Sequence, residues 1–215
     1  MNTSRHMLKK LLFILCFIAG VQLAQAQKSG FGLKAGINHS YLVYNGSRDI
    51  TNSLNNISFG VFYAKRLSHS TLLQYEINLL NVGGKFSTNE FAGIVKNSNQ
   101  VTAEQRLSYL NIPILAKMYV SKRLHFIAGP YFNTILAAEI TYDSDIEFPE
   151  ITNTAIDNKD DIRPYEMGAI LGVGLDTRMG LLFDLRYHHG LTDISDTKGL
   201  TQYNRGFQFS VGWMF

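Results

Sequence analysis

The last stretch of the chain, Gly206-Phe207-Gln208-Phe209-Ser210-Val211-Gly212-Trp213-Met214-Phe215, decides the fold. Every second residue is large and apolar, and the residues between them are small or polar except for one methionine. This period of two predicts a β-strand with two unlike faces. The apolar face consists of Phe207, Phe209, Val211, Trp213 and Phe215. Such a face points at lipid in an outer-membrane barrel, where a terminal aromatic residue also serves as an assembly signal. In a soluble sandwich it would face a core.

The same alternation recurs in seven segments upstream. They cover about residues 31–41, 57–67, 73–79, 106–120, 124–137, 165–175 and 181–191. Tight connections at 68–70, 121–123 and 177–178 alternate with long ones at 43–56, 84–105, 138–163 and 192–203. Short periplasmic turns and long external loops are typical of membrane-spanning barrels. The sequence therefore predicts an all-β, eight-stranded antiparallel up-and-down transmembrane β-barrel with both termini in the periplasm.

The polar face of these strands is dominated by small residues, which favours an inward orientation. Its glycines are Gly32, Gly36, Gly60, Gly129, Gly168, Gly172, Gly174, Gly190, Gly206 and Gly212. A face exposed to water, as in a soluble lipocalin-like barrel, would instead be dense in Lys and Glu. The interior of an eight-stranded barrel is only wide enough to be filled by side chains. We therefore expect the glycines inside and the apolar residues against lipid.

Charged residues of both signs share this polar face. Buried charges persist when they are paired, so we expect an interior network of salt bridges and hydrogen bonds. Its predicted members are Lys34, Arg66, Glu76, Lys117, Glu166, Asp184 and Arg186.

Three residues disturb the pattern. Pro113 and Pro130 fall inside strands, where each removes a ladder donor, and we expect a local bulge at both. Phe62 puts a large apolar side chain on the polar face and breaks the alternation of its strand.

Residues 1–26 have the pattern of a secretory signal peptide, which leaves residues 27–215 as one barrel domain. Arg5, Lys9 and Lys10 precede an apolar run, and Ala24-Gln25-Ala26 forms a cleavage site. The only cysteine, Cys16, lies within this segment, so the mature chain is expected to contain no disulfide. Cleavage would remove three of the 20 Lys and Arg residues and none of the 17 acidic ones. The neutral product offers no basic patch for nucleic acid.

Short motifs along the whole mature chain resemble the PorT-like outer-membrane β-barrel family. They are Phe31-Gly32-Leu33-Lys34-Ala35-Gly36-Ile37-Asn38, Gln74-Tyr75-Glu76, Gly83-Gly84-Lys85, Tyr109-Leu110-Asn111-Ile112-Pro113, Ala128-Gly129-Pro130-Tyr131 and Arg186-Tyr187-His188-His189-Gly190-Leu191-Thr192. The resemblance implies an eight-stranded outer-membrane barrel, and some members of that family are linked to a secretion system for surface and extracellular proteins. Asn111 stands where an acidic residue is expected, so one interior charge partner would be missing.

Hydrolytic groups occur close together near the end of the seventh strand. They are Asp184, His188, His189, Asp193 and Ser195. Ser195 is not in a G-x-S-x-G elbow, and no residues mark an oxyanion hole. We expect His188 in the interior network and His189 at the bilayer rim. The sequence predicts neither an enzyme nor a bound cofactor.

The third long connection is acidic. Its carboxylates are Glu139, Asp143, Asp145, Glu147, Glu150, Asp157, Asp160 and Asp161. Asp143, Asp145 and Glu147 have the spacing of a hard-cation loop but lack the Gly and distal Glu of an EF-hand. A solvated loop is the favoured interpretation and predicts no metal site. A divalent ion that bridges the loop to anionic lipid head groups remains the alternative. Likewise Lys65-Arg66 and Lys122-Arg123, at tight turns, provide solubility or contact phosphates or a periplasmic partner.

These observations predict a non-enzymatic outer-membrane anchor whose external loops form an interaction surface. Its expected partners are outer-membrane lipid, the barrel-assembly machinery and surface or secretion-system proteins. An accessory role in protein secretion is the alternative. A small-solute pore is disfavoured because eight strands leave no aqueous channel.

Overall fold

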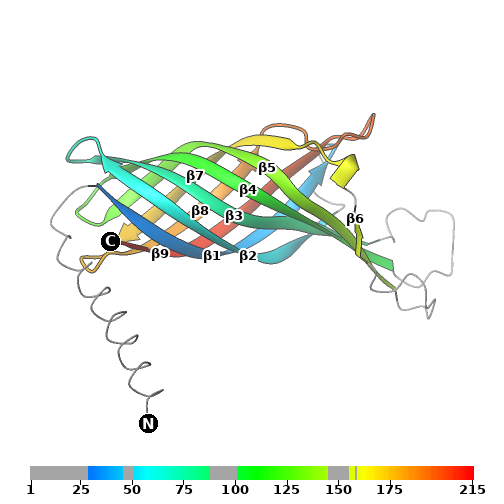
Figure 1. Cartoon of the computed structure of the whole chain (residues 1–215), viewed down its shortest axis with the longest axis horizontal. Helices are drawn as coiled ribbons and strands as arrows, with labels where there is room; N and C mark the ends of the chain where they lie inside the picture. The colour runs from blue at the N-terminus through cyan, green and yellow to red at the C-terminus, as the bar shows by residue number, and fades with distance from the viewer. Residues whose placement is uncertain (1–28, 46–50, 88–100, 145–154, 158) are drawn as a thin grey trace, which may run out of the picture.

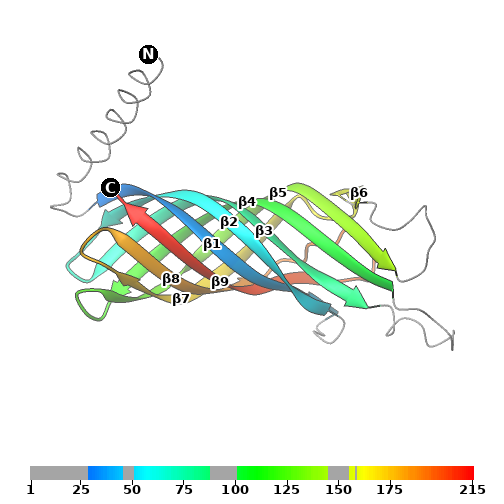
Figure 2. The same cartoon turned by 90° about the horizontal axis from the view of Figure 1, so that it is seen from below.

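The computed structural model describes residues 29–45, 51–87, 101–144, 155–157 and 159–215. In this part of the chain, eight long antiparallel strands form a closed barrel, drawn in Figures 1 and 2. The strands are β1 (Ser29–Tyr44), β2 (Thr51–Arg66), β3 (Thr71–Ser87), β4 (Val101–Tyr119), β5 (Leu124–Ser144), β7 (Tyr165–Asp176), β8 (Leu181–Gly190) and β9 (Gln202–Met214). The short strand β6 (Ala155–Asp157) pairs with the outer part of β5, and a 3-10 turn, Lys159–Asp161, follows. No helix of the described residues is long and apolar enough to cross a membrane.

The barrel closes between the first and last strands of the chain. β1 pairs with β9 over 13 residue pairs, from Gly32 with Met214 to Tyr44 with Gln202. The Phe215 amide donates a hydrogen bond to the Phe31 carbonyl at 2.9 Å. The start of β1 and the C-terminus therefore lie together, at the end of the barrel that carries the tight turns (Figure 1). The predicted eight-stranded up-and-down barrel is confirmed.

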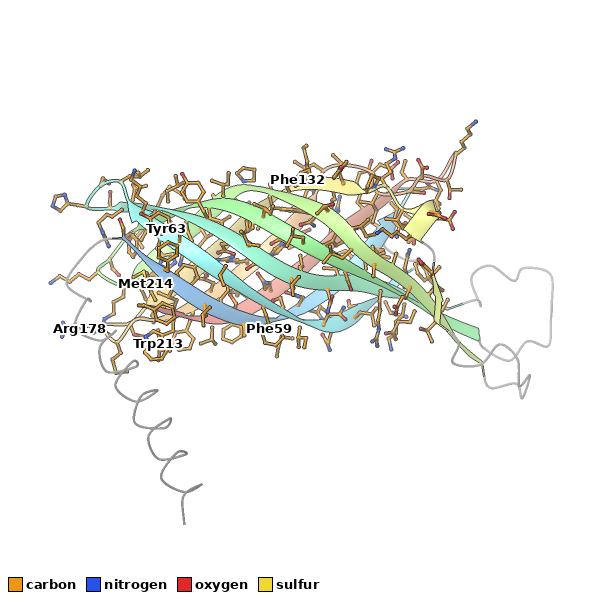
Figure 3. The ribbon with its side chains drawn as sticks, viewed as in Figure 1. Phe59, Tyr63, Phe132, Arg178, Trp213 and Met214 are labelled. Carbon is orange, nitrogen blue, oxygen red and sulfur yellow. The ribbon has the colours of Figure 1, made fainter. Side chains whose placement is uncertain are left out.

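The outer wall carries an apolar band. Phe31 is 68% exposed and Leu79 57% exposed, and side chains such as Phe59 and Phe132 project outward in Figure 3. On β9, Phe207, Phe209, Val211 and Phe215 are exposed on this wall, and Trp213 lies beside Phe215. Side chains of opposite parity point inward and are buried, and they include most of the polar residues of the strands. The predicted inside and outside are therefore correct in this band.

Phe62 lies inside the barrel, as its place on the polar face predicts, and the inward–outward alternation of β2 continues through it. Its side chain is 2% exposed and packs with Ala64, Leu72 and Leu182 near the tight turns. Gly32 makes room for it, because a Cβ at this glycine would lie 2.1 Å from the Phe62 ring.

The two prolines lie within strands but cause no bulge there, so that expectation was wrong. The β3–β4 ladder lacks two pairs around Pro113, and the β4–β5 ladder lacks two pairs around Pro130, yet the register continues unchanged on both sides. Each proline removes one ladder donor, and the neighbouring pairs of the closed sheet hold the register. A Cβ at Gly129 would lie 2.0 Å from the Ile114 carbonyl oxygen, so this glycine lets β4 and β5 approach closely at the gap.

Several strands extend further than their sequence pattern indicated. β2 begins at residue 51, β3 ends at 87, β4 begins at 101 and β5 ends at 144, so the predicted long connections are shorter. In these outer extensions the polarity is reversed: charged residues such as Lys85 and Arg106 face outward, whereas Leu107 and Ala138 are buried. The expected strands ended where the apolar outer face ended.

Candidate functional site

A chain of ion pairs crosses the middle of the barrel. Glu76 of β3 accepts two hydrogen bonds from the Arg186 guanidinium of β8, at 2.8 and 3.0 Å. Lys34 of β1 donates to Glu76 at 3.1 Å, and Arg186 also donates to Asp184 at 2.6 Å. Lys117 of β4 lies 3.4 Å from the other Asp184 oxygen. All five side chains are buried, and each charged group lies within 4.0 Å of at least one group of opposite charge.

Two residues that the sequence did not single out complete this chain toward the tight turns. Asp176 lies 3.9 Å from Lys117, and Tyr119 donates a hydrogen bond to its other oxygen at 2.5 Å. His125, fully buried, lies 3.5 Å from Asp184 and 3.7 Å from Asp176. Asp176 and His125 both stand at inward-facing positions of their strands, near Lys117. This position in the alternation is the sequence signal that could have identified them.

Glu166 is not part of the ion-pair chain, in contrast to the expectation. Among the described residues, no Lys or Arg nitrogen lies within 4.0 Å of its carboxylate. Neutral groups surround it instead: Tyr131 donates at 2.7 Å, Asn204 at 2.8 Å and Asn133 at 3.1 Å. Three donors directed at one carboxylate replace part of its lost hydration without a counter-ion.

A row of asparagines connects the two carboxylates across three strands. The Asn78 amide donates to Glu76 at 3.0 Å and to Asn111 at 3.0 Å. Asn111 donates to Asn133 at 2.6 Å, and Asn133 donates to Glu166. An acidic residue at position 111 would have no hydrogen to donate to Asn133. Asn111 is therefore a link in a neutral chain of amides that points its donors toward Glu166, rather than a missing charge.

Arg66 also lies outside the ion-pair chain, at the turn end of β2. Its guanidinium donates to the His69 carbonyl at 3.1 Å and stacks 5.4 Å from the centre of the Tyr119 ring. Arg66 does stand at an inward-facing position, as predicted. Because β2 ends at this residue, its side chain lies at the turn end of the barrel and does not reach the ion pairs in the middle of the interior.

The hydrolytic candidates do not meet. His188 faces inward, and its Nε2 lies 3.2 Å from Gln208 Oε1. Ser195 Oγ accepts the Thr197 amide, whereas the Asp193 carboxylate accepts the amides of Ser195 and Gln202. These contacts shape the loop before β9 and bring no base to the serine.

No group of three or more His, Cys, Asp or Glu side chains in the described residues could hold a metal ion. Within the acidic connection, Glu139, Asp157, Asp160 and Asp161 are exposed. Asp145, Glu147 and Glu150 lie outside the described residues, as does the predicted signal peptide.

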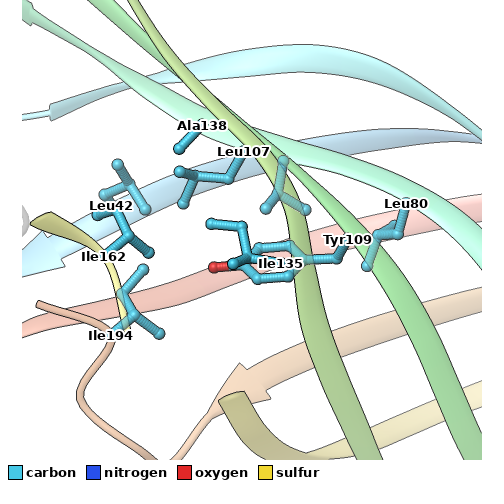
Figure 4. Close-up of a cluster of buried hydrophobic side chains, with 9 residues drawn as sticks. Leu42, Leu80, Leu107, Tyr109, Ile135, Ala138, Ile162 and Ile194 are labelled. Carbon is cyan, nitrogen blue, oxygen red and sulfur yellow. The ribbon is translucent and has the colours of Figure 1, made fainter. Parts of the chain in front are cut away.

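The end of the barrel opposite the tight turns is closed by an apolar cluster (Figure 4). Its buried members are Leu42, Leu80, Val82, Leu107, Tyr109, Ile135, Ala138, Ile162 and Ile194. Ile162 precedes β7 and Ile194 lies between β8 and β9, and a single bridge from Ile162 to Ser195 joins the two segments. Hydrogen bonds from the Arg163 amide to Ile194 and from the Asp196 amide to Asp161 hold them over the opening. The interior is thus filled by ions in the middle and by apolar side chains at this end.

An apolar outer band around a filled, charge-paired interior defines an integral outer-membrane β-barrel protein. The chain belongs to the family of outer membrane protein β-barrel domains, whose model matches residues 24–196. The match establishes this family and not the PorT-like group that the motifs resemble. None of the curated proteins matches the chain.

Among solved structures, Neisserial surface protein A covers 88% of this chain and 100% of its own, with a TM-score of 0.52 and 10% identity. The attachment invasion locus protein Ail of Yersinia pestis has the same coverages, a TM-score of 0.47 and 8% identity. OprG of Pseudomonas aeruginosa covers 89% of this chain and 98% of its own, with a TM-score of 0.34 and 11% identity. At such identities, the likeness to the Neisserial protein concerns the fold alone.

Proposed function

We propose that this protein is a non-enzymatic outer-membrane anchor that acts through its outer end and not through its lumen. The observation that carries the proposal is the closure of the interior. Ion pairs fill the middle, and Ile162 and Ile194 join the apolar cluster at one mouth. A filled lumen transports no solute, so contacts with other molecules fall to the surfaces at the two ends.

The end opposite the tight turns is the better platform for a partner. Strand extensions carry it beyond the apolar band, and the segments around Ile162 and Ile194 are fixed to the barrel. Exposed charges of both signs, such as Lys159, Arg163, Asp196 and Lys198, decorate it. Binding surfaces on loops that a rigid scaffold positions are common in proteins. In this proposal that end faces the outside, and both termini lie in the periplasm.

Cysteine labelling tests the orientation. Lys198→Cys and Lys122→Cys place one thiol at each end of the barrel, and the only native cysteine, Cys16, lies in the predicted signal peptide. A membrane-impermeant maleimide should label intact cells that carry Lys198→Cys, whereas cells with Lys122→Cys should react only after lysis. The reverse labelling pattern would overturn the proposed orientation.

Conductance tests the closed lumen. The purified barrel in planar bilayers at neutral pH should give no steady ion current, because buried ion pairs and apolar side chains of the described residues fill the interior of this narrow barrel. A stable single-channel current that persists at low voltage would contradict the anchor and favour a small-solute pore.

The C-terminal strand supports a further part of the proposal, recognition by the barrel-assembly machinery. Phe207, Phe209, Val211 and Phe215 face outward, where another protein can contact them before lipid does. Deletion of Phe215 should lower the folded fraction in cells while refolding into detergent micelles stays normal. An equal loss in both would assign Phe215 to stability alone.

An accessory role in secretion is the second candidate, and the PorT-like motifs favour it. Deletion of the gene should then reduce secreted and surface proteins without altering other outer-membrane barrels. Unchanged secretion would contradict the secretion role and leave the proposal of an anchor with a different partner.

A further inference from the structure

The outer wall of the barrel contains a polar hollow of about 180 Å³. Its lining residues come from four consecutive strands, β2 to β5. The side chains around it are those of Asn56, Asn81, Arg106, Ser108, Ala137 and Glu139.

Irregular pairing creates the hollow. The β2–β3 ladder is interrupted between Ser53 and Ser58 with a shift of register, and the β4–β5 ladder shifts at Ser108. Bulges of this kind bend a strand and occur often at barrel rims and beside binding sites. The wall is therefore deformed at one level on two neighbouring strand pairs.

Side chains of β1 close this break from the inside. Ser40 Oγ accepts the Gly83 amide at 2.9 Å and donates to the Gly83 carbonyl at 3.2 Å. Asn38 donates to the Asn81 carbonyl at 3.3 Å. Three backbone groups of β3 at this break, the Asn81 carbonyl and the amide and carbonyl of Gly83, are thus satisfied from within the barrel, and the outer side of the break stays open to a ligand.

The hollow lies at the border between the apolar band and the charged extensions. Ile57, Leu79 and Leu136, next to it on three of its strands, are exposed apolar side chains. Beyond it, Glu104 pairs with Lys85 at 3.0 Å and with Arg106. An occupant therefore has its polar part at the membrane surface and its acyl chains along the band below.

The lining favours a head group with hydroxyls and a negative charge. Asn81 and Ser108 offer neutral donors and acceptors, and the Asn56 amide nitrogen is buried with no hydrogen-bond partner in the described structure. Arg106 supplies a cation whose side chain is 62% exposed, and Glu139 supplies an acceptor for a hydroxyl. Guanidinium groups bind phosphate with paired, charge-assisted hydrogen bonds.

We propose that this hollow binds the phosphorylated saccharide head group of an outer-leaflet glycolipid. The inference rests on the proposed function in one respect, namely that the extended end of the barrel faces outward. Arg106 contacts the phosphate, and Asn56, Asn81 and Ser108 contact sugar hydroxyls.

Calorimetric titration of lipid A into the folded protein in dodecyl maltoside micelles tests the proposal, with phosphatidylglycerol as the second probe. Arg106→Gln should weaken lipid A binding at least tenfold, in keeping with the loss of charge-assisted hydrogen bonds, and Asn81→Ala should weaken it severalfold. Lys85→Gln is the matched control, because it removes a positive charge and a Glu104 partner but lines no part of the hollow. Its affinity should stay within about twofold of the wild type.

Equal losses for Arg106→Gln and Lys85→Gln would overturn the site in favour of general charge attraction. If phosphatidylglycerol binds as tightly as lipid A, the saccharide is not recognised and that part of the proposal is wrong. If Arg106→Gln and Asn81→Ala both bind lipid A normally, the hollow is not the binding site. Each variant is first shown to be folded by its heat-dependent shift on a gel. Because binding in micelles is independent of orientation in the cell, a failure here leaves the labelling result intact, and the reverse also holds.

Discussion

The barrel consists of two regions with opposite polarity. Within the apolar band, residues such as Leu79 and Phe209 face outward and the interior holds ions and amides. In the outer extensions, Arg106 and Glu104 face outward and Leu107 is buried inside. The first region is solvated by lipid outside and by its own side chains inside, whereas the second has the arrangement of a soluble protein. The environment of the outer wall, and not the fold, decides which side of the same strand is apolar.

The largest expected change in stability that tests this comparison concerns the interior of the apolar band. Arg186→Met removes the cation that two carboxylates, Glu76 and Asp184, share. Breaking a buried ion pair from one side costs about 3–5 kcal/mol, because it leaves an uncompensated charge. Urea unfolding in detergent micelles should show a loss of this size. A change below about 1 kcal/mol would mean that water compensates the carboxylates.

The next test concerns the interior of the extensions. Leu107→Ala should lower the free energy of unfolding by about 2–5 kcal/mol, since Leu107 is fully buried and its truncation leaves a cavity. Leu79→Ala is the control, because detergent or lipid chains fill the space outside the band. Equal losses in the same urea titration would contradict the reversed polarity.

A third test compares the contributions of Glu76 and Glu166 to stability. Glu76→Gln loses two cationic partners and should cost about 2–3 kcal/mol, whereas Glu166→Gln changes only neutral hydrogen bonds and should cost about 1 kcal/mol. The two variants are compared by thermal unfolding on gels. If Glu166→Gln is more destabilising than Glu76→Gln, the neutral hydrogen bonds to Glu166 contribute more stability than the ion pairs of Glu76, and our interpretation of the two carboxylates is wrong.

The smallest effect is a pH dependence of the extensions. Partial burial tends to raise the pKa of Glu104, but hydrogen bonds from Lys85 and Arg106 outweigh it and hold this pKa below its usual value of 4.5. A carboxyl with a depressed pKa adds stability above its unfolded pKa and loses it as pH falls. The difference in unfolding free energy between wild type and Glu104→Gln should be at most about 1 kcal/mol at pH 7. It should begin to decline as pH falls below 4.5 and should vanish once pH lies below the lowered pKa of Glu104 in the folded protein, where this carboxyl is protonated. A difference that persists at acid pH would assign the effect to packing.

Much of the band was predictable from sequence, because lipid outside and a narrow interior impose strict alternation on each strand. The lipid-facing side chains of β9 follow directly from their spacing. The extensions were not predictable in this way: water accepts Lys85 or Glu104 on the outer wall, so the apolar signal disappears while the strand continues.

The sequence predicted which charged residues face the interior of the barrel, but it did not predict which of them pair with each other. Parity placed Glu76, Glu166 and Arg186 inside, yet the pairing depends on which height each side chain occupies in the tilted sheet. Glu166 lies beside Asn204 and Tyr131 and not beside a cation, and no local pattern in the sequence contains that information.

The ion-pair chain also bears on how the molecule forms. Arg186 and Glu76 are 110 residues apart, and they belong to β8 and β3, which are not neighbours in the sheet. Until the cylinder is complete, Arg186 and Glu76 cannot pair with each other, and each keeps only partners on its own strand, Asp184 for Arg186 and Gln74 and Asn78 for Glu76. Exposure of such incompletely paired charges to hydrocarbon is costly. We therefore expect insertion and closure to be coupled, because a partly assembled barrel would leave these charges in contact with hydrocarbon.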